Sequence, residues 1–157
     1  MGSLPEIMDD LPTTVPAGNS TAPPQLDSLA SAATLKARVL VVDDDALLRR
    51  VYRREIAKTG LDVVEAESGD VALGLLAGGL DVAVVLLDYR MPGTMGDVVL
   101  REVRAKYPEV AVIMCSGEMT AALAREFEKL GACCCLEKPV PRGAIQSAVT
   151  AIAAITR

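Results

Sequence analysis

The sequence of 157 residues contains no histidine and no tryptophan. Without histidine, the chain cannot form a Ser–His or Cys–His catalytic pair, and it cannot bind a metal ion through imidazole. It also cannot carry a phosphohistidine. Any acid–base or nucleophilic chemistry must therefore use carboxylates, hydroxyls, thiols or lysine.

Aromatic residues and positive charge are scarce as well. Three tyrosines and one phenylalanine leave little for base stacking or for an aromatic cage, and 16 basic against 21 acidic residues give a net charge of −5. Domains that bind nucleic acids carry an excess of basic residues. We therefore expect no direct binding to DNA.

The four cysteines are Cys115, Cys133, Cys134 and Cys135. Three of them are consecutive, which fits neither a disulfide framework nor the CxxC spacing of metal sites. We predict buried thiols in a reducing cytosol. A redox sensor is the alternative, but Lys138 is the only basic residue near the cluster that would favour a thiolate.

No segment predicts export or insertion into a membrane. The N-terminus lacks the basic and apolar regions of a signal peptide. The longest candidate for a membrane span, residues 82–87, is only six residues long, far short of a membrane helix. We expect a cytoplasmic protein.

Residues 1–36 differ in composition from the rest of the chain. They contain five of the nine prolines, together with Ser, Thr, Asn and Gly, and they show little hydrophobic periodicity. This composition predicts a flexible tail, with a weak helical pattern at residues 26–35. The folded domain is expected over residues 37–157.

From residue 38 onward, short β-branched runs alternate with segments of helical periodicity. Strands are predicted at Val39–Val42, Asp62–Ala66, Val82–Leu87, Val110–Cys115 and Cys133–Leu136. Helices are predicted at Ala46–Thr59, Asp70–Ala77, Gly96–Lys106, Thr120–Leu130 and Arg142–Ile155. In the first helix, the pattern places Leu47, Leu48, Val51 and Ile56 inward, and the basic residues Arg49, Arg50, Arg53, Arg54 and Lys58 mostly outward.

Five strand–helix units predict an α/β domain. Strands that are apolar on both faces are covered by helices on both sides, which is typical of a parallel sheet. We therefore predict a doubly wound, five-stranded parallel sheet of flavodoxin-like order 2-1-3-4-5 with five helices. In such folds the functional site lies at the carboxyl ends of the strands.

Polar side chains follow four of the predicted strands. Asp43-Asp44-Asp45 follows the first strand, Asp88 the third, Ser116 the fourth, and Lys138 the fifth. Glu65, at the end of the second strand, is expected at the sheet edge and in solvent. Because close carboxylates repel one another, a proton, Lys138 or a divalent cation must compensate them, and an oxygen-only site with open positions suits Mg²⁺.

Each of these residues has a simpler interpretation when taken alone. Asp45 fits the N-cap of the helix that begins at Ala46, and we assign it that role. Ser116 would most often cap the following helix, Lys138 would most often be solvated, and Asp88 could be a turn residue. Their joint occurrence at one edge of the sheet favours a functional site.

At this point the residues match a known family. Residues 38–156 resemble the receiver domain of bacterial two-component response regulators, particularly stand-alone receivers of the chemotaxis-regulator type. A receiver excised from a hybrid kinase is the alternative. The matching segments are residues 39–45, residues 86–93 with Gly96, Ser116-Gly117, Gly131-Ala132 and Lys138-Pro139.

The resemblance implies a role for each site residue. Asp88 is the expected phosphoacceptor, and Asp43, Asp44, Asp88 and the backbone carbonyl of Arg90 are the expected Mg²⁺ ligands. Ser116 takes the place of the switch hydroxyl, and Lys138 that of the lysine that pairs with the phosphoryl group. The donor is expected to be a phosphohistidine on a histidine kinase or phosphotransfer protein, and the output a downstream protein. The Lys138–Pro139 peptide is expected to be cis.

One position departs from the family pattern. Family members usually carry Tyr or Phe three residues before the lysine, where this chain has Cys135. We predict that phosphorylation is intact but that its coupling to the output face is altered.

Two other functions would use some of the same residues. A receiver-like binding module that is never phosphorylated remains an alternative because of Cys135. A phosphatase with an aspartate nucleophile is disfavoured, since Arg90 stands where such an enzyme needs a second aspartate. We therefore expect no enzyme that turns over an external substrate. The basic side of the first helix, Arg49 to Lys58, is typical of a solvated face, and the resemblance implies that it borders the surface where kinase helices dock.

Overall fold

A computed structural model of the chain describes residues 37–156. The expected flexible tail at residues 1–36, with its short helical pattern, and Arg157 lie outside the described residues. The elements, in chain order, are β1 (Arg38–Val42), α3 (Ala46–Ala57), β2 (Asp62–Ala66), α4 (Gly69–Ala77), β3 (Val84–Asp88), α5 (Gly96–Lys106), β4 (Ala111–Ser116), α6 (Ala121–Lys129), β5 (Cys134–Glu137) and α7 (Ala144–Thr156).

The five strands form one parallel sheet in the order β2-β1-β3-β4-β5. All ten predicted elements are present within the described residues, and their ends differ from the predictions by at most two residues. The predicted fold class and strand order are confirmed. Because every strand runs the same way, the residues that follow β1, β3, β4 and β5 gather at one edge.

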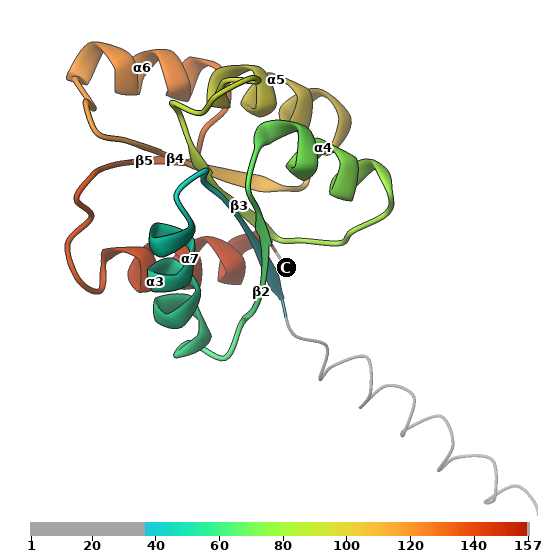
Figure 1. Cartoon of the computed structure of the whole chain (residues 1–157), viewed down its shortest axis with the longest axis vertical. Helices are drawn as coiled ribbons and strands as arrows, with labels where there is room; N and C mark the ends of the chain where they lie inside the picture. The colour runs from blue at the N-terminus through green and yellow to red at the C-terminus, as the bar shows by residue number, and fades with distance from the viewer. Residues whose placement is uncertain (1–36, 157) are drawn as a thin grey trace, which may run out of the picture. The chain divides into compact units, whose positions relative to one another are not determined.

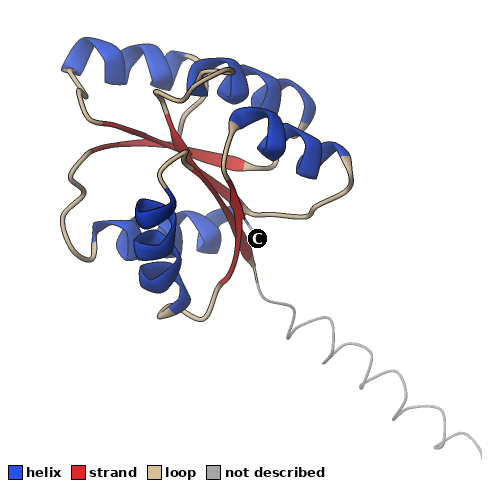
Figure 2. Cartoon of the chain, in the orientation of Figure 1, coloured by secondary structure: helices blue, strands red, loops and turns tan. Residues whose placement is uncertain are grey.

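Helices cover both faces of the sheet. Helices α3 and α7 lie on one side, and α4, α5 and α6 lie on the other (Figures 1 and 2). Strands β1, β3 and β4 are buried on both faces because each face carries its own apolar cluster, built around Phe127 and Leu100 on one side and Ile56 and Val149 on the other. The sheet is therefore a rigid platform for the edge that carries the site.

Helix α3 shows where the sequence prediction was wrong. Leu47 and Val51 were expected to point inward, but they are 69% and 51% exposed. The buried line instead runs through Tyr52 and Ile56, with half-buried Leu48 one turn earlier. These three positions follow an i, i+4, i+8 spacing, so they share one face of the helix, and Leu47 and Val51 fall outside it.

Within the described residues, no helix has both the length and the apolar character needed to cross a membrane.

Candidate functional site

Three aspartates meet at the carboxyl edge of the sheet. Asp43 follows β1 directly and Asp88 ends β3, and these two strands are paired neighbours. Asp44 is the next residue along the chain. One carboxylate oxygen from each residue lies within 4.8 Å of the others, with Asp43 and Asp88 buried and Asp44 exposed. The juxtaposition expected from the strand ends is therefore present.

Lys138 compensates the two buried carboxylates. It follows β5, and its Nζ lies 2.7 Å from Oδ2 of Asp43 and 3.0 Å from Oδ1 of Asp88. Burial opposes the positive charge of Lys138, but the hydrogen bonds to Asp43 and Asp88 outweigh it and raise the pKa of the ammonium group. Lys138 is therefore held in its charged form between the two aspartates.

At Asp88, burial affects the pKa more than the hydrogen bond from Lys138 does. Burial raises the pKa of this carboxyl group, the hydrogen bond from Lys138 opposes the rise, and the negative charges of Asp43 and Asp44 add to it. Asp88 is thus a carboxylate whose negative charge is only partly offset by its protein neighbours. A site of this kind favours a further cation.

Ser116 is the buried hydroxyl of the site. It ends β4, one residue beyond the partner of Asp88 in the sheet register. Its Oγ accepts a hydrogen bond of 3.2 Å from the backbone N–H of Glu118. The helix that follows is capped by Thr120, so the N-cap role considered for Ser116 is wrong. The hydrogen bond given for this hydroxyl among residues 37–156 is thus a local one, within the turn after β4.

Arg90 lies in the loop that follows Asp88. Its exposed guanidinium is 3.5 Å from the carboxylate of Glu118, which lies in the loop after β4. This weak ion pair joins the two loops that flank Asp88 and Ser116. The role expected for the backbone carbonyl of Arg90 stays a prediction.

Two smaller expectations are confirmed. The Oδ1 of Asp45 accepts hydrogen bonds from the backbone N–H groups of Leu47 and Leu48, so Asp45 is the N-cap of α3. The Lys138–Pro139 peptide bond is cis.

A set of contacts behind Asp43 differs from what the sequence predicted. Arg49 was expected to point outward, but its side chain is only 15% exposed, and its Nη1 donates a 2.7 Å hydrogen bond to the backbone carbonyl of Asp43. Glu65 was expected in solvent, but it accepts hydrogen bonds from Arg49 at 3.2 Å and Arg53 at 2.8 Å. The hydrogen bond from Arg53, opposed by burial and reinforced by Arg49, lowers the pKa of Glu65.

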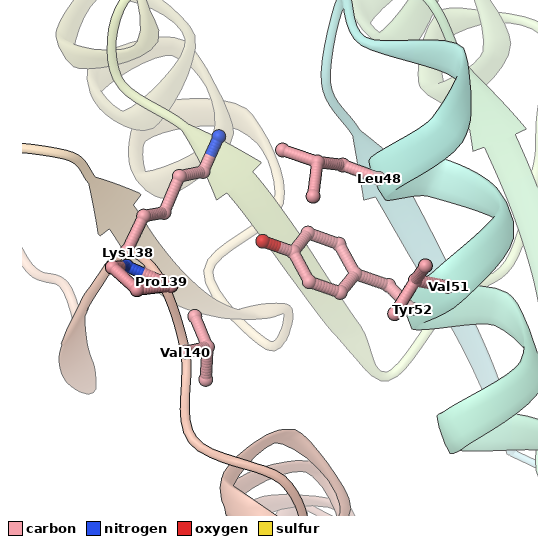
Figure 3. A pocket seen from close by; sticks show the side chains of 6 residues that line it. All are labelled: Leu48, Val51, Tyr52, Lys138, Pro139 and Val140. Carbon is pink, nitrogen blue, oxygen red and sulfur yellow. The ribbon is translucent and has the colours of Figure 1, made fainter.

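A groove of about 370 Å³ lies beside Lys138 (Figure 3). Its walls come from α3 and from the segment after β5, and the residues that line it are Leu48, Val51, Tyr52, Lys138, Pro139 and Val140. Burial raises the pKa of Tyr52 to about 12, so its phenol is neutral at physiological pH. No sequence signal distinguished Tyr52 from an ordinary core residue.

The cysteines differ in their surroundings. Cys115 is buried, Cys134 and Cys135 are half-buried, and Cys133 is exposed, so the prediction of buried thiols is wrong for Cys133. Burial raises the pKa of Cys115 to about 12 and that of Cys135 to about 11, and it also raises the pKa of Cys134. A raised thiol pKa disfavours the reactive thiolate. These three cysteines therefore do not resemble redox sensors.

The donor set at the acidic edge fits a hard divalent cation. Mg²⁺ prefers carboxylate and carbonyl oxygens and keeps several of its waters, which suits a site with two buried aspartates and one exposed aspartate. The three carboxylates also need more positive charge than Lys138 alone supplies. Asp43, Asp44 and Asp88 are thus the residues that could hold such an ion.

Comparisons with known proteins point to one family. Residues 39–150 match the family model of the response regulator receiver domain. The chain is 38% identical over 115 residues to the transcriptional regulatory protein FixJ of Azorhizobium caulinodans, a match that covers 72% of this chain and 53% of FixJ. It is also 38% identical over 84 residues to a chemotaxis protein CheY homolog of Campylobacter jejuni, covering 52% of this chain and 65% of that protein.

Solved structures agree with these matches. The receiver domain of the Francisella response regulator 1452 superposes with a TM-score of 0.73 at 25% identity, covering 78% of this chain and all of that domain. A receiver domain protein from Clostridium thermocellum superposes with a TM-score of 0.70 at 28% identity, covering 76% of this chain and 95% of that one.

Proposed function

Because the chain belongs to the response regulator receiver domain family, we propose that Asp88 accepts a phosphoryl group from a phosphohistidine on a partner protein. The observation that carries this proposal is the placement of Asp88. Its carboxylate is buried at the end of a central strand, beside Asp43 and within 3.0 Å of the ammonium group of Lys138. Phosphoryl transfer needs chiefly this kind of positioning and charge neutralisation.

The reaction exchanges one bond to phosphorus for another. A carboxylate oxygen of Asp88 attacks phosphorus, the phosphorus–nitrogen bond to the donor imidazole breaks, and the bonding electrons stay with the imidazole. The product is an acyl phosphate on Asp88. A divalent cation bound by Asp43, Asp44, Asp88 and the carbonyl of Arg90 would offset the negative charge of the transferring group.

Two side chains are placed to respond to the new charge. Lys138 already contacts Asp88, so its ammonium group is available to the phosphoryl oxygens once Asp88 is modified. The Oγ of Ser116 accepts a hydrogen bond from the N–H of Glu118, which leaves the hydroxyl proton able to turn and donate to the phosphoryl group. A phosphoryl group adds up to two negative charges and three strong acceptors, enough to draw in both donors.

The conformational consequence would appear around α6 and β5. The loop that carries Ser116 and Glu118 leads directly into α6, so a change at Ser116 shifts the populations of conformers on that face. We propose that this face binds a downstream protein, and that the chain has no turnover of an external substrate.

Two alternatives remain to be separated by experiment. A binding module that is never phosphorylated would keep the fold and leave Asp88 unmodified. A phosphatase with an aspartate nucleophile is disfavoured because the residue two positions after Asp88 is Arg90, whose guanidinium is exposed and paired with Glu118.

The proposal is tested by intact mass after incubation with Mg²⁺ and acetyl phosphate. The wild-type chain is expected to gain one phosphoryl group, and the gain is expected to disappear in Asp88→Asn and after addition of a chelator. Asp81→Asn, at an exposed position away from the site, is the matched control and should behave like wild type. No gain in wild type, with acetyl phosphate or with a panel of phosphorylated kinases, would favour the binding module.

A further inference from the structure

Asp43 is held by its backbone as well as by its side chain. Its N–H donates a 3.2 Å hydrogen bond to the carbonyl of Ala66, at the end of the edge strand β2. Its own carbonyl accepts the 2.7 Å hydrogen bond from Nη1 of Arg49. The two peptide groups on either side of the Asp43 side chain are therefore both fixed.

Both restraints lead back to the same short stretch of β2. Glu65, the residue just before Ala66, holds Nε of Arg49 at 3.2 Å. The guanidinium of Arg49 thus joins Glu65 to the Asp43 carbonyl, while Ala66 holds the Asp43 N–H directly. We call Arg49, Glu65 and Ala66 the β2 clamp.

We infer that Arg49 is a positioning residue for cation binding, and that the β2 clamp holds the Asp43–Asp44 segment in the conformation that a divalent cation needs. The inference rests on the proposed function for the identity of the cation. The hydrogen bonds of the β2 clamp reach the backbone of Asp43 and not the carboxylates of Asp43, Asp44 or Asp88.

The physical reason lies in the repulsion among the aspartates. Asp43, Asp44 and Asp88 place three carboxylate oxygens within 4.8 Å of one another. Like charges at such separations repel by about 4 kcal/mol at an effective dielectric constant near 20, so an unrestrained loop would move apart. A charge-assisted hydrogen bond to the backbone opposes that movement without neutralising the carboxylates themselves.

Arg53 provides a matched control for the role of Arg49. Arg53 also donates to Glu65, at 2.8 Å, and it also tethers α3 to β2, but among the described residues it makes no hydrogen bond or ion pair with Asp43. Loss of Arg53 therefore tests the tether between α3 and β2, whereas loss of Arg49 tests the hold on Asp43.

The experiment measures Mg²⁺ affinity of the full chain from amide NMR shifts in Arg49→Gln, Arg53→Gln and wild type. We expect the Kd for Mg²⁺ to rise about tenfold in Arg49→Gln, the lower end of the range for residues that orient metal ligands, and less than twofold in Arg53→Gln. Arg49→Lys keeps the charge but replaces the two nitrogens that reach Glu65 and the Asp43 carbonyl with a single ammonium nitrogen, so its Kd should lie between those of wild type and Arg49→Gln. The inference would be overturned if Arg49→Gln bound Mg²⁺ with the same Kd as wild type. It would also be overturned if the Kd for Mg²⁺ rose equally in Arg49→Gln and Arg53→Gln.

A second measurement needs no cation. The N–H of Asp45 donates to Oδ1 of Asp43, so its hydrogen exchange reports the order of this loop. Exchange should be at least fivefold faster in Arg49→Gln than in Arg53→Gln, and equal rates would count against the clamp. If Arg49→Gln fails to fold, Glu65→Gln replaces it, with a smaller expected rise in Kd of about threefold. Absence of Mg²⁺ binding in wild type would instead contradict the proposed function, and the exchange rates would still test the clamp.

Discussion

Cys135 lies at the position that separates this chain from the pattern of its family. Its Sγ is 3.8 Å from the backbone carbonyl of Ala124, so a thiol lies between β5 and α6 where the family pattern has an aromatic ring. The thiol is much smaller than a ring. The effect predicted for this position is on signal output rather than on phosphoryl transfer.

The first prediction concerns this position. Cys135→Tyr should be phosphorylated to the same extent as wild type, because no hydrogen bond or ion pair among the described residues joins Cys135 to Asp43, Asp88 or the Lys138 side chain. The phosphorylation-dependent amide shifts on α6 and β5 should change at least twofold in size. Intact mass measures the first quantity and NMR the second, and equal shifts in both proteins would refute the prediction.

At the scale of one element, α3 presents two surfaces to solvent. Leu47 and Val51 form an exposed apolar strip beside the groove at Lys138. Arg50 and Arg54 flank this strip and take part in no ion pair found among residues 37–156. Arg49 and Arg53, by contrast, are engaged by Glu65.

Because Arg49 and Arg53 are bound by Glu65, docking of a phosphodonor is tested at Arg50 and Arg54 instead. Charge reversal at Arg50 and Arg54 should slow transfer from a phosphorylated kinase about tenfold if the kinase docks on this exposed side of α3, and it should leave labelling by acetyl phosphate unchanged. Charge reversal at Arg49 would also remove its hydrogen bond to the Asp43 carbonyl, and charge reversal at Arg49 or Arg53 would break an ion pair with Glu65. The rates of the two phosphorylation reactions are compared in one preparation, and an unchanged rate from the kinase would show that this side of α3 is only solvated.

Helix α5 begins where it meets the end of β3. A Cβ added at Gly96 would overlap the backbone carbonyl oxygen of Asp88 and approach Cα of Tyr89 to 2.8 Å. Both are backbone atoms at the end of β3 and just after it, so they cannot move aside as a flexible side chain would. Glycine is required here by a close approach of two elements.

Gly96→Ala should therefore destabilise the chain by about 2 kcal/mol or more, in the range of overpacking in a core. The matched substitution is Gly74→Ala in α4, where an added Cβ meets no atom within 4 Å. That change should be neutral or stabilising by up to about 1 kcal/mol because alanine favours a helix. Urea unfolding of both variants gives the comparison, and equal free energies of unfolding would contradict it.

On the scale of the whole molecule, two apolar layers hold a charged edge in place. Both faces of β1, β3 and β4 are buried, so the strand ends cannot shift without disturbing a packed core. The charged edge itself works against folding, because burial and neighbouring aspartates raise the pKa of Asp88. A cation that binds the folded chain should relieve this cost.

We therefore predict that Mg²⁺ stabilises the wild-type chain. At a concentration 100 times its Kd, a ligand that binds only the folded state adds about 2.7 kcal/mol to the free energy of unfolding. The midpoint temperature of thermal unfolding should be several degrees higher in Mg²⁺ than in NaCl of equal ionic strength. The same comparison should give a much smaller difference for Asp44→Asn. No shift in wild type would contradict the proposed cation site.

The pH dependence follows from the sign of the Asp88 shift. A carboxyl group whose pKa is raised on folding keeps its proton longer in the folded chain than in the unfolded one. As pH rises above the ordinary carboxyl range, the unfolded chain ionises first, and the folded state loses stability relative to it. The stabilising effect of Mg²⁺ should therefore be larger at pH 7 than at pH 4.

The sequence alone determined the order of the elements and the identity of the residues at the strand ends. Hydrophobic periodicity is a local property, and parallel strands bring their carboxyl ends to one edge whatever the details of packing. The juxtaposition of Asp43, Asp88 and Lys138 follows from these two facts. Asp45 could be identified as an N-cap because that contact is made within one turn.

Only the tertiary structure decided which face of α3 is buried, and which basic residues are engaged. Leu47 and Val51 are apolar but exposed, and Arg49 is charged but mostly covered, because the neighbours of a helix face come from distant parts of the chain. The contacts of Arg49 with Glu65 and with the Asp43 carbonyl depend on β2 lying beside β1. Such contacts leave no periodic pattern in the sequence, since they depend on packing in three dimensions.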